Sequence, residues 1–150
     1  MATYTADDIT RFRAKAYLLK FEVSPTYYSR PMEEMVEICN GVGGKGNFLN
    51  PVLNFVYSNF QASSTGHDEE YFIGGNRKDR LKADRHFKRN MLREWKKNYN
   101  WFERLIRPKA REEKMLIIAA YSALRMLGHN YFNYVTSEEM EKDTPKEAKE

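Results

Sequence analysis

Residues 66–72 of this chain, near its middle, are Gly66-His67-Asp68-Glu69-Glu70-Tyr71-Phe72. If residues 60–72 form a helix, His67 and Tyr71 lie on the same face, because four residues make about one helical turn. Asp68 then lies about 100° round the axis from His67. An imidazole and a phenol share one face while a carboxylate points to the side. The pattern indicates a catalytic site, a metal site or simply a polar helix face.

A glycine cluster precedes this helix, in the stretch Cys39-Asn40-Gly41-Val42-Gly43-Gly44-Lys45-Gly46. Its glycines disfavour a helix or a strand and leave backbone amides and carbonyls open to an ion or a phosphate. A plain flexible turn is the alternative. The cluster is not a Walker motif, because Gly46 stands where Ser or Thr is required and the spacing is wrong.

A long basic helix is predicted to follow, from Asn76 to about Phe102. Its apolar stripe contains Leu81, Phe87, Met91, Trp95 and Phe102, and lysines and arginines cover the rest of its surface. Asp84 lies on the same stripe, where an unpartnered carboxylate would be costly to bury. A structural salt bridge, a hydrogen bond between helices or a catalytic role would each explain its position.

Periodicity and capping residues predict the remaining organisation. Helices are expected at about residues 5–21, 31–38 and 109–127, with a loop at residues 24–31. The central helix begins between residues 60 and 65 and ends at Gly74-Gly75, whereas residues 48–60 fit a strand, a loop or a helical lead-in. We therefore expect a mainly α-helical domain over residues 1–136, with two central helices that hold the site, and a charged, flexible tail at residues 137–150.

Composition and charge exclude several classes of protein. Cys39 is the single cysteine, so an internal disulfide and a CxxC metal or redox site are excluded. No apolar run approaches the roughly 20 residues of a membrane span, and no signal peptide is visible. We expect cytoplasmic synthesis, followed by association with a virion or delivery to a target membrane. Residues 77–114 contain fifteen Lys or Arg and six Asp or Glu, a local net charge of +9, which favours an anionic partner surface.

The order of these parts resembles that of phospholipase A2 enzymes, most closely the bacterial and phage-type members. The similar region covers residues 38–92, with the glycine loop first, then His67-Asp68-Glu69-Glu70-Tyr71, a Gly-Gly turn and the helix around Asp84. The resemblance implies that His67 is the general base that takes a proton from the water attacking the sn-2 ester. It also implies that Asp84 accepts a hydrogen bond from the other His67 nitrogen and that Tyr71 hydrogen-bonds to Asp84.

The same resemblance implies a Ca²⁺ ion. Asp68 would bind it together with the backbone carbonyls of Cys39, Gly41 and Gly43, and such oxygens are the ligands that Ca²⁺ prefers. The cation would polarise the ester carbonyl and stabilise the oxyanion that develops there.

Three functions fit these observations. The first is a Ca²⁺-dependent phospholipase A2-like hydrolase, phage or bacterial in origin, that acts on a phospholipid membrane surface. The second is a catalytically silent protein of the same fold that serves as a virion, tail or host-interaction component. The third, which the sequence favours least, is a basic module that binds nucleic acid.

Overall fold

The computed structural model describes residues 3–42 and 50–144. Within these residues the chain is mainly helical, as predicted, and contains no strand; an isolated bridge joins Gly75 to Tyr134. The α-helices are α1 (Ala6–Leu18), α2 (Met32–Glu37), α3 (Pro51–Asn59), α4 (Gln61–Ile73), α5 (Arg77–Asn98), α6 (Trp101–Ile106), α7 (Pro108–Leu127) and α8 (Ser137–Asp143). A π-helical turn, η1 (Ile38–Val42), and a 3-10 turn, η2 (Gly128–Asn130), complete the set. No helix in this part of the chain is long and apolar enough to cross a bilayer.

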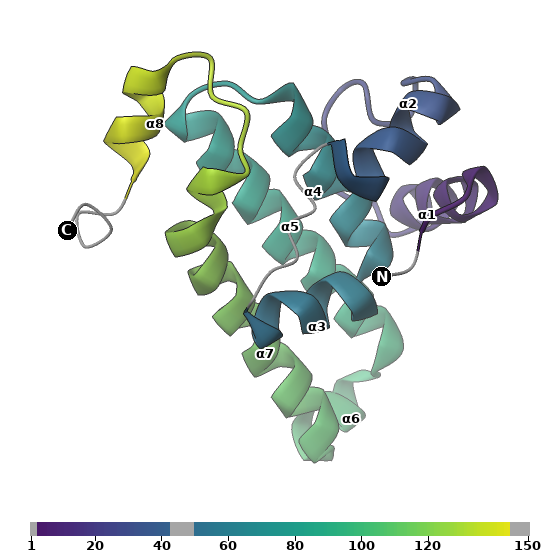
Figure 1. Cartoon of the computed structure of the whole chain (residues 1–150). Helices are drawn as coiled ribbons and strands as arrows, with labels where there is room; N and C mark the ends of the chain where they lie inside the picture. Colours follow the sequence, from purple (N-terminus) through teal and green to yellow (C-terminus); the bar gives the residue numbers. More distant parts are fainter. Residues whose placement is uncertain (1–2, 43–49, 145–150) are drawn as a thin grey trace.

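The two longest helices, α5 and α7, lie side by side along the molecule (Figure 1). Helix α4 packs against α5, α1 packs against α4, and α3 packs across α7. The largest apolar cluster lies between α3, α5 and α7. Helix α6 is at the lower end of the molecule in Figure 1, and α8 is at the upper end.

Local sequence signals explain where several helices begin. Thr5 and Asp8 form the predicted capping box of α1. The side chain of Asn50 caps α3, whose first residue is Pro51, so the undecided segment 48–60 is helical over residues 51–59. Asn76 and Asp79 form a second capping box at the start of α5.

The long basic helix is shorter than predicted. It ends at Asn98, and the separate helix α6 starts at Trp101, because Asn100 forms a capping box with Glu103 and adopts an extended conformation. Phe102 therefore does not continue the buried stripe of α5, and its side chain is half exposed. The first helix is also shorter, since it ends at Leu18.

The segment after residue 136 also differs from the expectation of a flexible tail. Residues 137–143 form α8, which Thr136 caps by accepting a hydrogen bond from the backbone of Glu139. Asp143, at the end of α8, contacts a buried arginine of α5, so this helix is joined to the domain.

Gly74 ends α4 and allows the segment after α7 to pack closely against it. Its φ is +72°, and a Cβ there would lie 1.8 Å from the carbonyl oxygen of Asn133. The adjacent Gly75 donates a backbone hydrogen bond to the same carbonyl at 2.9 Å. Only glycine fits this turn without strain.

Candidate active site

Helix α4 supplies the centre of the candidate site, and it is the most enclosed helix of the domain. Every residue from Ala62 to Glu69 is buried, although most of these residues are polar. Internal hydrogen bonds satisfy most of their polar groups: Ser63 donates to Glu94 at 2.6 Å, and Thr65 shares a hydrogen bond with Tyr27 at 2.9 Å. The helix can be buried because most of its polar groups are hydrogen-bonded inside the protein.

His67, Tyr71 and Asp84 lie in contact, the arrangement that the resemblance implies. His67 Nε2 is 3.1 Å from Asp84 Oδ1, and the hydroxyl of Tyr71 donates to the same oxygen at 2.6 Å. The side chains of His67 and Asp84 are inaccessible to solvent. The carboxylate on the apolar stripe of α5 thus has specific partners on α4.

The second nitrogen of His67 also has a partner. The hydroxyl of Tyr57, on α3, is 2.8 Å from His67 Nδ1. Phe87 of α5 stacks on the imidazole, with ring centroids 4.6 Å apart and planes inclined by 21°. The ring is therefore held at both nitrogens and on one face.

These contacts assign the tautomer of a neutral His67. An ionised Asp84 can only accept a hydrogen bond, so Nε2 must be the nitrogen that donates to it. Burial raises the pKa of Tyr57 well above its ordinary value, and nearby carboxylates raise it further, so the hydroxyl keeps its proton and is able to donate it to Nδ1. Nδ1 is then the acceptor, and Nε2 carries the hydrogen that it donates to Asp84.

Asp84 remains ionised in this environment. Burial alone raises the pKa of its carboxyl, but the hydrogen bonds of His67 and Tyr71 and the charge of Arg80 outweigh burial and hold that pKa below its ordinary value. The other carboxylate oxygen, Oδ2, is 3.5 Å from Arg80 Nη1 and also forms an ion pair with Arg125.

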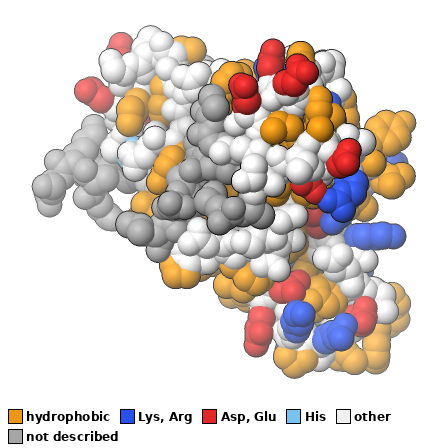
Figure 2. Space-filling model, turned by 45° about the vertical axis from the view of Figure 1, so that its right-hand side comes forward, with side chains coloured by type: hydrophobic (Ala, Val, Ile, Leu, Met, Phe, Trp, Pro, Cys, Tyr) orange, Lys and Arg blue, Asp and Glu red, His pale blue; other side chains and the backbone are white. Residues whose placement is uncertain are grey.

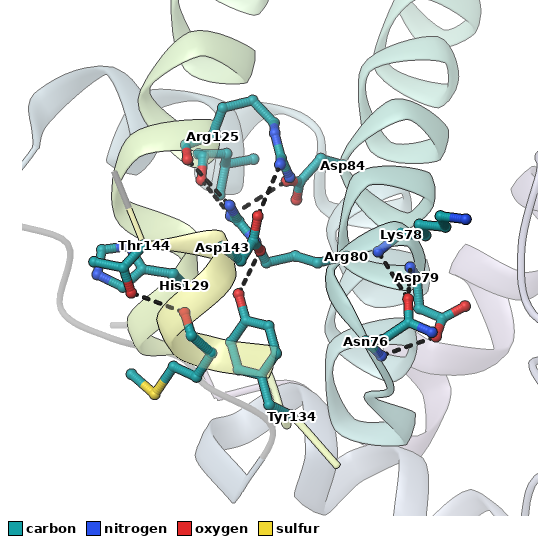
Figure 3. A network of polar contacts seen from close by, with 12 residues as sticks. Asn76, Lys78, Asp79, Arg80, Asp84, Arg125, His129, Tyr134, Asp143 and Thr144 are labelled. Carbon is teal, nitrogen blue, oxygen red and sulfur yellow. Dashed lines mark hydrogen bonds and ion pairs between the residues drawn. The ribbon is translucent and has the colours of Figure 1, made fainter. Parts of the chain in front are cut away.

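The two arginines belong to a partly buried network that joins α5, α7 and α8 (Figure 3). Arg80 points from α5 toward α7 and donates to the carbonyls of Leu124 at 3.0 Å and Arg125 at 3.1 Å. Its Nε binds Asp143 of α8, which also accepts a hydrogen bond from Tyr134. Helix α8 thus holds in place an arginine that lies against Asp84.

Sequence reasoning did not identify Tyr57, Arg80, Arg125 or Asp143 as part of this site. A signal existed for Arg80 alone, because it precedes Asp84 by four residues on one helix, the spacing of an ion pair. The other three come from segments whose packing no local pattern specifies. They reach the site through the packing of α3, α7 and α8.

Asp68, the predicted calcium ligand, is buried beside His67 on α4. Its charge adds to the effect of burial in raising the pKa values of Tyr4 and Tyr57, so its carboxylate lies near both hydroxyls. The turn η1, which contains Cys39 and Gly41, packs against α4.

The donors proposed for calcium are a carboxylate and backbone carbonyls, which suit a hard cation in chemical type. Gly43 lies outside the described residues. Among the residues that the structure describes, no three His, Cys, Asp or Glu side chains form a group that could hold a metal. A cation beside Asp68 would therefore depend on backbone oxygens.

Comparisons of the chain with protein-family models, curated proteins and solved structures found no significant match.

Proposed function

We propose that this protein is a phospholipase A2-like hydrolase of glycerophospholipid esters, dependent on Ca²⁺, from a phage or a bacterium. The observation that supports the proposal most directly is the contact between His67 Nε2 and Asp84 Oδ1 at 3.1 Å, with Tyr71 bound to the same oxygen. A general base needs a partner that orients its ring and stabilises its protonated form, and a buried carboxylate does both.

His67 would take the proton at Nδ1, because Nε2 is occupied by Asp84. Water that approaches Nδ1 would lose a proton to it while attacking the ester carbonyl, and Asp84 would stabilise the resulting imidazolium. The ester C–O bond would then break, and the leaving alcohol oxygen would take the proton back from Nδ1. The hydroxyl of Tyr57 occupies this position in the structure. It must therefore move before water can bind, and a shift of α3 would also open the buried imidazole to substrate.

Asp68 and the backbone carbonyls of Cys39, Gly41 and Gly43 would hold the Ca²⁺ ion. When bound, it would supply Lewis-acid polarisation of the ester carbonyl. The role of Asp68 itself is to place a negative charge one residue from the general base on the same helix.

The proposal is tested by release of fatty acid from phosphatidylcholine vesicles, with Ca²⁺ or with a chelator. We expect hydrolysis that needs Ca²⁺ and that His67→Ala abolishes. His86→Ala is the matched control, because His86 lies on α5 and bonds to Glu70 outside the site. Hydrolysis that survives His67→Ala or the chelator would refute the proposal, provided that circular dichroism shows both variants folded.

One observation favours a second candidate, a catalytically silent protein of the same fold that acts in a virion, a tail or a host interaction. His67 is 1% exposed and Tyr57 already binds its Nδ1, an arrangement that also suits a purely structural histidine. This candidate predicts a folded protein without hydrolysis that co-purifies with a particle. In that case His67→Ala would lower stability with no catalytic effect.

A further inference from the structure

Helix α6 exposes four large hydrophobic side chains next to one another. Trp101 is 68% exposed, Phe102 52%, Leu105 64% and Ile106 57%, and the helix contains no buried residue. These four side chains form what we call the α6 tip. Contiguous exposed apolar groups of this size mark interaction sites, whereas single exposed hydrophobic residues are ordinary.

The α6 tip is held in a defined orientation. Asn100 and Glu103 form a capping box at its start, and Pro108 begins α7 two residues after it ends. Arg104 lies over the ring of Trp95, which is buried at the end of α5. The apolar side chains are therefore presented by a short, anchored turn at the end of the α5–α7 pair (Figure 1).

Basic residues outnumber acidic ones in the segments on either side of the tip. Residues 96–114 contain seven Lys or Arg (Lys96, Lys97, Arg104, Arg107, Lys109, Arg111, Lys114) and three Glu (Glu103, Glu112, Glu113), a local net charge of 7 − 3 = +4. Glu103 already forms an ion pair with Arg107 and a hydrogen bond with the backbone of Asn100. Figure 2 shows Lys and Arg side chains beside exposed hydrophobic ones at this lower end, with acidic groups interspersed.

We propose that the α6 tip inserts into the interface of an anionic lipid bilayer. Aromatic side chains are favourable at the headgroup level, aliphatic ones reach the acyl boundary, and flanking cations attract anionic headgroups. A second protein or a second copy fits less well. Four side chains of about 200 Å² each, a little over half exposed, offer roughly 500 Å², below the roughly 800 Å² per partner of a stable interface.

This surface is independent of the proposed ester chemistry. Asp84 precedes Asn98, the last residue of α5, by 14 residues, which corresponds to about 21 Å along the helix. The tip would attach the protein to a membrane whether or not His67 acts as a base.

Trp101 serves as a reporter of insertion. The chain has two tryptophans, and Trp95 is buried, with its Nε1 bonded to the carbonyl of Ala110. We expect diether phosphatidylglycerol vesicles, which contain no carboxylic ester bond, to shift the fluorescence of the protein to shorter wavelength. We expect no shift with diether phosphatidylcholine vesicles, and Trp101→Phe should abolish the shift.

A paired substitution tests the apolar contribution. Leu105→Ser with Ile106→Ser should weaken partitioning to anionic vesicles at least about tenfold. Tyr17→Ser with Leu18→Ser is the matched control, because these residues of α1 are 74% and 76% exposed, and it should change partitioning less than about twofold.

Three results would overturn the proposal. The first is the absence of a shift with anionic vesicles, and the second is equal partitioning of the two paired variants. The third is a lipid-free dimer, seen by light scattering, that the α6 substitutions dissociate; this would assign the tip to a second copy. Because the vesicles contain no carboxylic ester for the proposed enzyme to hydrolyse, a failure of the esterase proposal would leave these results unchanged.

Discussion

Substitution of Arg80 by Met would test whether the network around Asp84 supports the fold. The Arg80 side chain is inaccessible to solvent, and it donates to two carbonyls of α7 and to Asp143 of α8. Its charge also lies 3.5 Å from Asp84. Met is similar in length but donates no hydrogen bond, so both carboxylates would lose a cationic partner inside the protein.

Removing one member of a buried ion pair costs about 3–5 kcal/mol, because the partner charge stays buried. That is a large part of the roughly 5–15 kcal/mol that stabilises a typical domain. Arg89→Met is the matched control on the same helix. Arg89 pairs with Glu22 at 2.9 Å, but its side chain is 55% exposed, so we expect a loss below about 1 kcal/mol.

The assay is urea unfolding at neutral pH, followed by circular dichroism, with the free energy of unfolding compared at an unchanged m-value. Equal losses for the two variants would refute the reasoning. If Arg80→Met does not fold, Arg80→Lys provides the measurement. Lys keeps the charge but cannot contact two carbonyls and two carboxylates at once, so an intermediate loss is expected.

Three further predictions concern the site. Gly128→Ala should lower the free energy of unfolding, measured in urea, by about 1–3 kcal/mol. The reason is that its Cβ would lie 2.4 Å from the Tyr71 hydroxyl. An unchanged free energy of unfolding would contradict this packing. Asp84 has a folded-state pKa below its ordinary 3.8, so the stability it contributes is complete above that pH and is lost as the pH falls through the folded-state pKa. The difference in free energy of unfolding between wild type and Asp84→Asn should accordingly be constant above about pH 5 and shrink below about pH 4, when unfolding is measured at a series of acid pH values. A difference that does not change with pH would exclude an ionised Asp84. Tyr57→Phe should lower the free energy of unfolding by about 0.5–1.5 kcal/mol. It should maintain or increase hydrolysis, because it frees Nδ1 of His67 for water. A large loss of hydrolysis in the vesicle assay would show that the hydroxyl itself is needed.

The two ends of the α5–α7 pair have different roles in these proposals. The upper end contains a buried polar centre whose groups have defined partners, and the lower end presents exposed apolar groups among cations. A single helix, α5, connects them, with Asp84 near its start and Asn98 at its end. Membrane attachment and ester hydrolysis can therefore be examined with separate substitutions.

Part of the candidate site was predictable because it depends on spacing within helices. His67 and Tyr71 share a face of α4 by their separation of four residues, and Asp84 required a partner because it lies on an apolar stripe. The contact of His67 and Tyr71 with Asp84 was expected only from the resemblance to phospholipase A2 enzymes. The partner of His67 Nδ1, which is Tyr57, and the arginines at Asp84 Oδ2 were not predictable in this way.

The sequence by itself determined the helical class, the start of several helices and the shared face of His67 and Tyr71, because periodicity, caps and turn glycines act over a few residues. Only the tertiary structure decided that Tyr57 occupies His67 Nδ1 and that Arg125 and Asp143 reach the network around Asp84. These contacts join residues 10 to 63 positions apart. The packing of whole helices, rather than any local preference of the chain, brings them together.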